Sequence, residues 1–175
     1  MIPNIITMVR LILVPVIVAM IGQGNWTLAF FCFAVAGVSD AIDGTIARRY
    51  SMQTELGAYL DPIADKALLV SIFVMLSFVG LIPGWVAIMV VSRDIMIVGG
   101  ILLAWVLGTP IPINPHLVSK INTTMQIAFA GLVLGTQAFL IKADWAVEYG
   151  IIVVAALTIA SMATYLTQFI KHMAD

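Results

Sequence analysis

Long apolar runs alternate with short polar breaks along the whole chain. Each run approaches or exceeds the roughly 20 mostly apolar residues that a helix needs to cross a bilayer. The breaks carry glycine, proline, asparagine and charged residues, which favour turns. The runs are Ile5–Ile21, Thr27–Ala47, Leu56–Val79, Trp85–Leu107, Ser119–Leu140 and Trp145–Ile170. The pattern predicts an all-α, polytopic membrane protein with six transmembrane helices.

The distribution of basic residues predicts the orientation of these spans. With six spans, both termini lie on the same side of the membrane. That side carries Arg48, Arg49, Lys120 and Lys171, whereas the opposite loops carry only Lys142. Because cytoplasmic loops of membrane proteins are enriched in Lys and Arg, both termini are predicted to be cytoplasmic.

Composition supports the membrane assignment. Hydrophobic residues make up 62% of the chain and charged residues 10%, whereas a soluble domain is about half apolar and about a quarter charged. The net charge of −1 gives no indication of a nucleic-acid partner. We therefore expect residues 1–175 to form a single membrane domain in contact with lipid.

Four aspartates lie where lipid is expected. Asp40 and Asp43 are in the second run, and Asp61 and Asp65 are in the third. An aspartate at a helix centre costs about 2.5–3.5 kcal/mol on insertion scales. The spacings place each pair on one helix face, and the short connection makes the two helices antiparallel neighbours. Converging carboxylates need cations, and hard oxygen ligands suit Mg²⁺, Mn²⁺ or Ca²⁺.

Small and basic residues surround these aspartates. Gly44, Ala47 and Gly57 would let either a bulky ligand or a neighbouring helix approach the backbone. Arg48 suits an anion clamp beside a phosphate, or a side chain that extends to the membrane interface. Both interpretations are open for these residues.

Together these residues form a spaced motif, Asp-x2-Asp-Gly-x2-Ala-Arg-x8-Gly-x3-Asp-x3-Asp, over residues 40–65. At all eight fixed positions it resembles the signature of the CDP-alcohol phosphotransferase family. The resemblance implies a six-helix membrane enzyme, usually a homodimer, that transfers a phosphatidyl group from CDP-diacylglycerol to an alcohol and releases CMP.

The resemblance also implies roles for the matching residues. Asp40, Asp43 and Asp61 would be metal ligands, and Asp65 would complete the metal site and act as the catalytic base. Two Mg²⁺ or Mn²⁺ ions are implied, and paired metals stabilise both the attacking and the leaving oxygen of such a transfer. The CDP site would be lined by Gly44, Ala47, Arg48 and Gly57.

Three further basic residues suggest the class of acceptor. Arg10, Arg93 and Lys120 lie in or at the edge of spans, where a basic pocket would suit an anionic acceptor. Alternatively, Arg93 forms a structural ion pair with an aspartate, although its neighbour Asp94 is not expected to face it. For Lys120, the alternative is an ordinary interfacial anchor on the cytoplasmic side.

Short stretches refine the acceptor. Residues 4–10 resemble both the phosphatidylglycerophosphate synthases and the cardiolipin synthases of the family, whereas residues 92–97 and 119–123 resemble the cardiolipin synthase branch more. The latter resemblance implies phosphatidylglycerol as acceptor. The alternative is glycerol-3-phosphate, as in phosphatidylglycerophosphate synthases. We expect the bacterial cytoplasmic (inner) membrane as the location, with the site facing the cytoplasm.

A divalent-cation transporter is the competing class, since intramembrane aspartates also mark ion pathways. Transport would not explain the small residues and the arginine at fixed offsets from the aspartates. Substitution of Asp65 separates the two classes, because it would abolish turnover in an enzyme but alter ion flux in a transporter.

Overall fold

The computed structural model describes the backbone of residues 2–50, 55–106 and 117–174, and the side chains of residues 8–39, 66–99, 117–168 and 170. Within these ranges every regular element is an α-helix, as predicted. The helices match the six apolar runs to within a few residues. They are α1 (Ile2–Gly22), α2 (Trp26–Tyr50), α3 (Glu55–Phe78), α4 (Gly84–Val106), α5 (Leu117–Ala138) and α6 (Asp144–Ala174).

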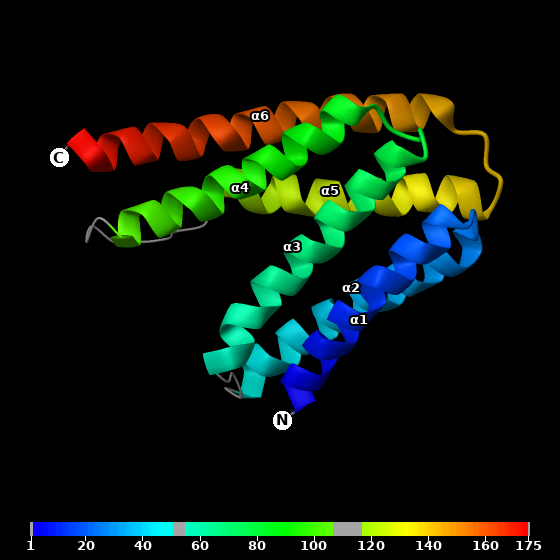
Figure 1. Cartoon of the computed structure of the whole chain (residues 1–175), viewed down its shortest axis with the longest axis horizontal. Coiled ribbons are helices and arrows are strands. Elements are labelled where there is room, and N and C mark those ends of the chain that lie inside the picture. The colour runs from blue at the N-terminus through cyan, green and yellow to red at the C-terminus, as the bar shows by residue number, and fades with distance from the viewer. Residues whose placement is uncertain (1, 51–54, 107–116, 175) are drawn as a thin grey trace.

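Three tight turns lie at one end of the bundle, which we call the turn end (Figure 1). They connect α1 to α2, α3 to α4, and α5 to α6. Each contains one residue in the left-handed region: Gly24 (φ 72°), Gly80 (φ 80°) or Leu140 (φ 53°). The next amide donates to a carbonyl five residues back, Asn25 to Met20, Leu81 to Leu76 and Ile141 to Thr136, each at 2.9 Å. This arrangement closes a helix by satisfying its last carbonyls.

The opposite end, which we call the terminal end, carries the N-terminus and the C-terminal end of α2 (Figure 1). Here α1, α2 and α3 diverge from α4, α5 and α6. α1 packs against both α2 and α3, whereas α5 packs against α2 and α6. α2 and α3 run antiparallel as predicted. Within the described residues, however, each packs on α1 rather than directly on the other.

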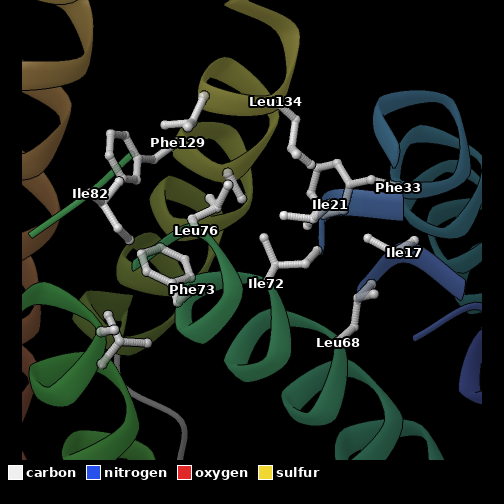
Figure 2. Close-up of a cluster of buried hydrophobic side chains, with 14 of the residues drawn as sticks. Ile17, Ile21, Phe33, Leu68, Ile72, Phe73, Leu76, Ile82, Phe129 and Leu134 are labelled. Carbon is white, nitrogen blue, oxygen red and sulfur yellow. The ribbon is translucent and has the colours of Figure 1, made fainter. Parts of the chain in front are cut away.

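The apolar core lies toward the turn end. Figure 2 shows Ile21 of α1, Phe33 of α2 and Leu134 of α5 converging, with Ile72 of α3 beside them. These four side chains are buried, and three of them, Ile21, Ile72 and Leu134, are fully so. Interdigitated packing of this kind holds helices together even where lipid replaces water outside.

The outer surface of the bundle is also apolar. Large hydrophobic side chains are exposed on every helix, including Ile12, Val38, Phe78, Ile88 and Ile152. So large an exposed apolar surface is unusual for a soluble monomer and is typical of a surface that contacts lipid or another protein.

Two helical stretches, Leu117–Ala138 and Asp144–Gln168, are long and apolar enough to cross a membrane by length and composition. Shorter apolar stretches lie in the described parts of α1, α2 and α3. The crossing of a membrane by all six helices stays a prediction.

Candidate functional site

The inward-facing side chains change from apolar to polar along the helices. On α4, buried Val86 and Val90 are followed one turn later by buried Arg93 and Asp94. The same change occurs from Ile17 to Arg10 on α1, from Phe129 to Gln126 and Asn122 on α5, and from Val154 to Thr158 and Ser161 on α6. The interior is therefore apolar toward the turn end and polar toward the terminal end.

Arg93 is the centre of the polar part. Its side chain is 1% exposed. Nη1 donates to Asp94 Oδ1 at 2.6 Å, and Nε and Nη2 donate to Ser161 Oγ on α6 at 3.2 and 3.0 Å. Nη2 also donates to Ser119 Oγ on α5. The planar, five-donor guanidinium suits several fixed partners at once, and it links α4, α5 and α6.

The prediction that Asp94 would not face Arg93 is wrong. Both positions border the interior of the bundle, and the long arginine side chain brings its Nη1 back to the adjacent carboxylate. The observed ion pair is the structural alternative that the sequence left open for Arg93. A contact between Arg93 and an acceptor stays a prediction.

Lys66 connects this cluster to α3. It directly follows Asp65 in the sequence, and its Nζ forms an ion pair with Asp94 Oδ1. The same carboxylate oxygen therefore faces both Lys66 and Arg93. The Lys66 side chain is 34% exposed and that of Asp94 is 7% exposed. One buried aspartate thus joins the cationic groups of two helices.

A chain of uncharged polar groups continues the cluster between α5 and α6. The Thr158 hydroxyl donates to Asn122 Oδ1 at 3.1 Å and accepts from Gln126 Nε2 at 3.4 Å. All three residues are fully buried. Hydrogen bonding of this kind is what makes buried polar groups tolerable in an apolar bundle.

The other two basic residues predicted for the acceptor pocket differ in exposure. Arg10 on α1 is 3% exposed, and α1 packs on both α2 and α3. Lys120 is exposed near the start of α5, which suits the interfacial anchor that the sequence allowed. The structure thus buries Arg10 and Arg93 but leaves Lys120 on the surface.

The predicted metal ligands have a described backbone, but their side chains lie outside the described residues. Asp40 and Asp43 are on α2, beyond its buried apolar stretch, and Asp61 and Asp65 are near the start of α3. The side chains of the predicted CDP site also lie outside the described residues; they belong to Gly44, Ala47, Arg48 and Gly57.

The connection between α2 and α3 limits how far apart these segments lie. Tyr50 ends α2 and Glu55 begins α3, so five Cα–Cα steps separate them and their Cα atoms are at most about 18 Å apart. Among the side chains that the structure describes, no group of three or more His, Cys, Asp or Glu suits a metal ion. The four aspartates therefore remain the candidate ligands. Their all-carboxylate chemistry fits a hard divalent cation such as Mg²⁺ or Mn²⁺.

Comparison with known families decides the classification. The model of the family described as CDP-alcohol phosphatidyltransferase matches residues 1–167. The chain belongs to the CDP-alcohol phosphatidyltransferase family. The match includes the spaced motif at 40–65 and all but the last turns of α6. Metal dependence is general in this family, in agreement with the carboxylate set.

Similar members of the family include synthases of two kinds. The chain is 38% identical over 150 residues to a probable cardiolipin synthase (CMP-forming) of Drosophila melanogaster, which covers 77% of this chain and 47% of the relative. It is 32% identical over 154 residues to the cardiolipin synthase (CMP-forming) of Homo sapiens, covering 79% and 51%. A probable phosphatidylglycerophosphate synthase of Mycobacterium tuberculosis is 40% identical over 98 residues, covering 53% and 47%. The chain spans about half the length of these relatives.

Sequence reasoning did not identify the polar groups that surround Arg93 as members of one cluster. Ser119 and Asn122 belong to the stretch at residues 119–123 that resembles cardiolipin synthases, and the sequence pattern alone indicated no role for Gln126, Thr158 or Ser161. Their spacing was the available signal. Inside the apolar runs, polar residues recur at intervals of three or four residues, which places them on one face of each helix. In the folded chain, those faces meet.

Proposed function

We propose that the chain transfers a phosphatidyl group from CDP-diacylglycerol to an alcohol and releases CMP. The observation that carries this proposal is the continuity between the buried stripes of α2 and α3 and the motif. On α2 the buried residues are Ala29, Phe33 and Ala36. Steps of four and then three residues continue this spacing to positions 40 and 43, which are both aspartates.

The same continuation holds on α3 in the opposite chain direction. Leu76, Ile72 and Leu68 are buried, and steps of three and then four residues reach Asp65 and Asp61. By helical spacing, both aspartate pairs are proposed to continue these interior-facing stripes toward the terminal end, where the other helices also become polar. A cluster of carboxylates facing lipid would be far more costly.

Asp40, Asp43, Asp61 and Asp65 are proposed to hold two Mg²⁺ or Mn²⁺ ions. When bound, such ions neutralise charge on the attacking and leaving oxygens of an in-line transfer. Asp65 accepts the proton of the acceptor hydroxyl. At the same time, the oxygen of that hydroxyl bonds to the phosphorus that carries the diacylglycerol. The bond from that phosphorus to the CMP oxygen breaks, and CMP leaves with the bonding electrons.

The remaining motif residues are proposed to bind the nucleotide. Arg48 pairs with a phosphate of CDP, since its guanidinium can donate two parallel hydrogen bonds. Gly44, Ala47 and Gly57 allow the nucleotide to approach the backbones of α2 and α3, because they carry little or no side chain.

Phosphatidylglycerol is the proposed acceptor, with cardiolipin as product. The basic residues proposed to receive its phosphate are Arg10, Arg93 and Lys120. The relatives named as cardiolipin synthases align over more of this chain than the phosphatidylglycerophosphate synthase does, which supports this choice. Glycerol-3-phosphate, another anionic acceptor, is the alternative.

The proposed setting is the bacterial cytoplasmic membrane, with six spans, both termini cytoplasmic and the active site facing the cytoplasm. The apolar outer surface of the bundle supports the membrane part of this proposal. A homodimer, which the family resemblance implies, completes it. Light scattering of the purified protein in detergent tests the dimer.

The acceptor is tested by offering phosphatidylglycerol and glycerol-3-phosphate separately. Purified protein in liposomes is incubated with CDP-diacylglycerol and Mg²⁺ or Mn²⁺, and CMP release and the lipid product are followed. Metal-dependent CMP release with cardiolipin formed from phosphatidylglycerol is expected. Release with glycerol-3-phosphate alone would replace the acceptor but keep the transfer reaction.

The transfer reaction itself is tested with Asp65→Asn, which keeps the shape of the side chain but removes the base. We expect CMP release to fall by at least 100-fold. The matched control is Asp144→Asn, because Asp144 is an exposed aspartate outside the motif, and it should retain normal activity. Absence of CMP release from folded wild-type protein with every acceptor, together with Asp65-dependent uptake of divalent cations, would favour a transporter instead.

A further inference from the structure

We infer that Asp94 is a positioning residue for the catalytic aspartates of α3, acting through Lys66. This inference rests on the proposed function, since it assigns the ion pair a role in shaping the metal site. Asp94 touches neither substrate nor metal in this assignment. Its carboxylate holds Lys66, and Lys66 directly follows Asp65 in the same helix.

Contacts from three helices hold the Asp94 carboxylate in place. Asp94 Oδ1 accepts hydrogen bonds from both Lys66 Nζ and Arg93 Nη1. Arg93 is in turn bonded to Ser119 of α5 and Ser161 of α6. Residues of α4, α5 and α6 therefore fix the position of the Asp94 carboxylate. This carboxylate in turn holds α3 through the ion pair with Lys66.

The ion pair holds α3 at Lys66, directly beside the proposed metal ligand Asp65. A helix transmits a displacement at one residue to its neighbours, because its backbone hydrogen bonds keep a fixed rise of about 1.5 Å per residue. Asp61 lies one turn before Asp65 on the same face. The carboxylates proposed to share a site on α2 and α3 would repel each other before cations bind, and this repulsion would push the two helices apart. The ion pair between α3 and α4 opposes a shift of α3.

The competing explanation is that the cluster only stabilises the fold. A purely structural role would lower thermal stability and the amount of folded protein, but folded molecules would bind metal with normal affinity. A positioning role changes the metal affinity of folded molecules, because ligands must be held within about 0.5 Å of their productive geometry. The dependence on metal concentration therefore separates the two roles.

The test uses Asp94→Asn, which removes the charge with little change in shape, and Asp94→Glu as the conservative variant. Mn²⁺ binding to the purified, detergent-solubilised chain is measured by electron paramagnetic resonance below the unfolding temperature of every variant. The Mg²⁺ concentration for half-maximal CMP release is measured in parallel. We expect Asp94→Asn to raise both the Kd for Mn²⁺ and the Mg²⁺ concentration for half-maximal CMP release by about tenfold, the lower end for residues that support metal ligands. Asp94→Glu should restore most of the loss. Because Arg93, the other partner of Asp94, is proposed to contact the acceptor, the KM for the acceptor should also change, but by less than the metal dependence.

A double-mutant cycle with Lys66→Met tests the route. If Asp94 acts through Lys66, the double variant Lys66→Met/Asp94→Asn should bind Mn²⁺ no more weakly than the weaker single variant. Normal Mn²⁺ affinity in Asp94→Asn, or additive losses in the double variant, would overturn the inference. So would a rise in acceptor KM alone, which would assign the cluster to the acceptor. Because Mn²⁺ binding needs no turnover, a wild-type protein that binds Mn²⁺ but releases no CMP would refute the proposed function separately.

Discussion

At the scale of single residues, Arg93 shows how a charge becomes tolerable inside an apolar bundle. Its guanidinium donates to one carboxylate and to two hydroxyl groups, on three different helices. Burial of a charge is costly unless it is paired and hydrogen-bonded. The partners of Arg93 are therefore part of the reason why an arginine is stable at this depth.

Arg93→Lys is expected to destabilise the protein although it preserves the charge. A lysine ammonium lacks the planar fork, so it cannot reach Asp94, Ser119 and Ser161 together, and at least one of these three groups loses its partner. The expected loss is about 1–3 kcal/mol of unfolding free energy, measured as a lower apparent Tm in detergent. Lys120→Arg, at an exposed position, is the control and should leave the Tm unchanged. Equal Tm values for wild type and Arg93→Lys would contradict this account.

At the scale of elements, the three turns at the turn end share one hydrogen-bond geometry but not one residue type. Two of them use glycine in the left-handed conformation, and the third uses Leu140. A side chain in that conformation costs about 1–2 kcal/mol because its Cβ approaches the following carbonyl. Leu140 is 87% exposed, so packing within the chain does not compensate for this cost.

Leu140→Gly is therefore expected to stabilise the connection between α5 and α6. Relief of the strain exceeds the extra freedom of glycine in the unfolded chain, which costs about 0.4–1 kcal/mol, and leaves a gain of about 0.5–1 kcal/mol. Thermal unfolding in detergent measures it. Gly80→Ala makes the opposite change in the equivalent turn and should lower the Tm. A lower Tm for Leu140→Gly would indicate instead that Leu140 contributes by contact with lipid or detergent.

The packing of α6 on α5 depends on a position without a side chain. A Cβ added at Gly150 would lie 2.4 Å from Cδ2 of Phe129, and Phe129 is buried in contact with Phe73. We expect Gly150→Ala to cost about 1–3 kcal/mol through overpacking. Gly99→Ala is the matched control, because nothing lies within 4 Å of the added Cβ there. If both variants unfold at the same temperature, the close approach of α6 to Phe129 is wrong.

At the scale of the whole molecule, the bundle has two internal environments and one outer surface. The interior is apolar near the three turns and polar toward the terminal end, whereas the outer surface is apolar on every helix. This distribution agrees with the proposed reaction near one face of the bilayer, where a water-soluble product could leave while lipid tails stay in the membrane.

Thiol labelling tests the proposed orientation of the molecule. In a Cys32→Ala background, Gln23→Cys and Lys142→Cys place a thiol in two exposed turns at the turn end, and Gln53→Cys places one in the connection between α2 and α3. In right-side-out vesicles, an impermeant maleimide should label the first two and reach the third only after permeabilisation. The reverse pattern would invert the orientation, and labelling of Gln23→Cys without Lys142→Cys would contradict the even number of spans between these turns.

The secondary-structure elements and the family of this protein were predictable from the sequence alone. Each apolar run was long enough to form a helix, and a helix satisfies its backbone hydrogen bonds within its own segment, so the elements could be predicted locally. The family was also evident from the spacing of the motif at residues 40–65. The roles of its aspartates stay predictions, because their side chains lie outside the described residues.

Only the tertiary structure decided which polar residues meet. Lys66 and Asp94 are 28 residues apart, and Arg93 is 26 residues from Ser119 and 68 from Ser161. No local pattern encodes such contacts, because they depend on the rotation and crossing of helices that pack against one another. The pairing of Arg93 with its own neighbour Asp94 was missed for the same reason: helical spacing describes which face a residue occupies, whereas the partners packed on that face decide where its side chain goes.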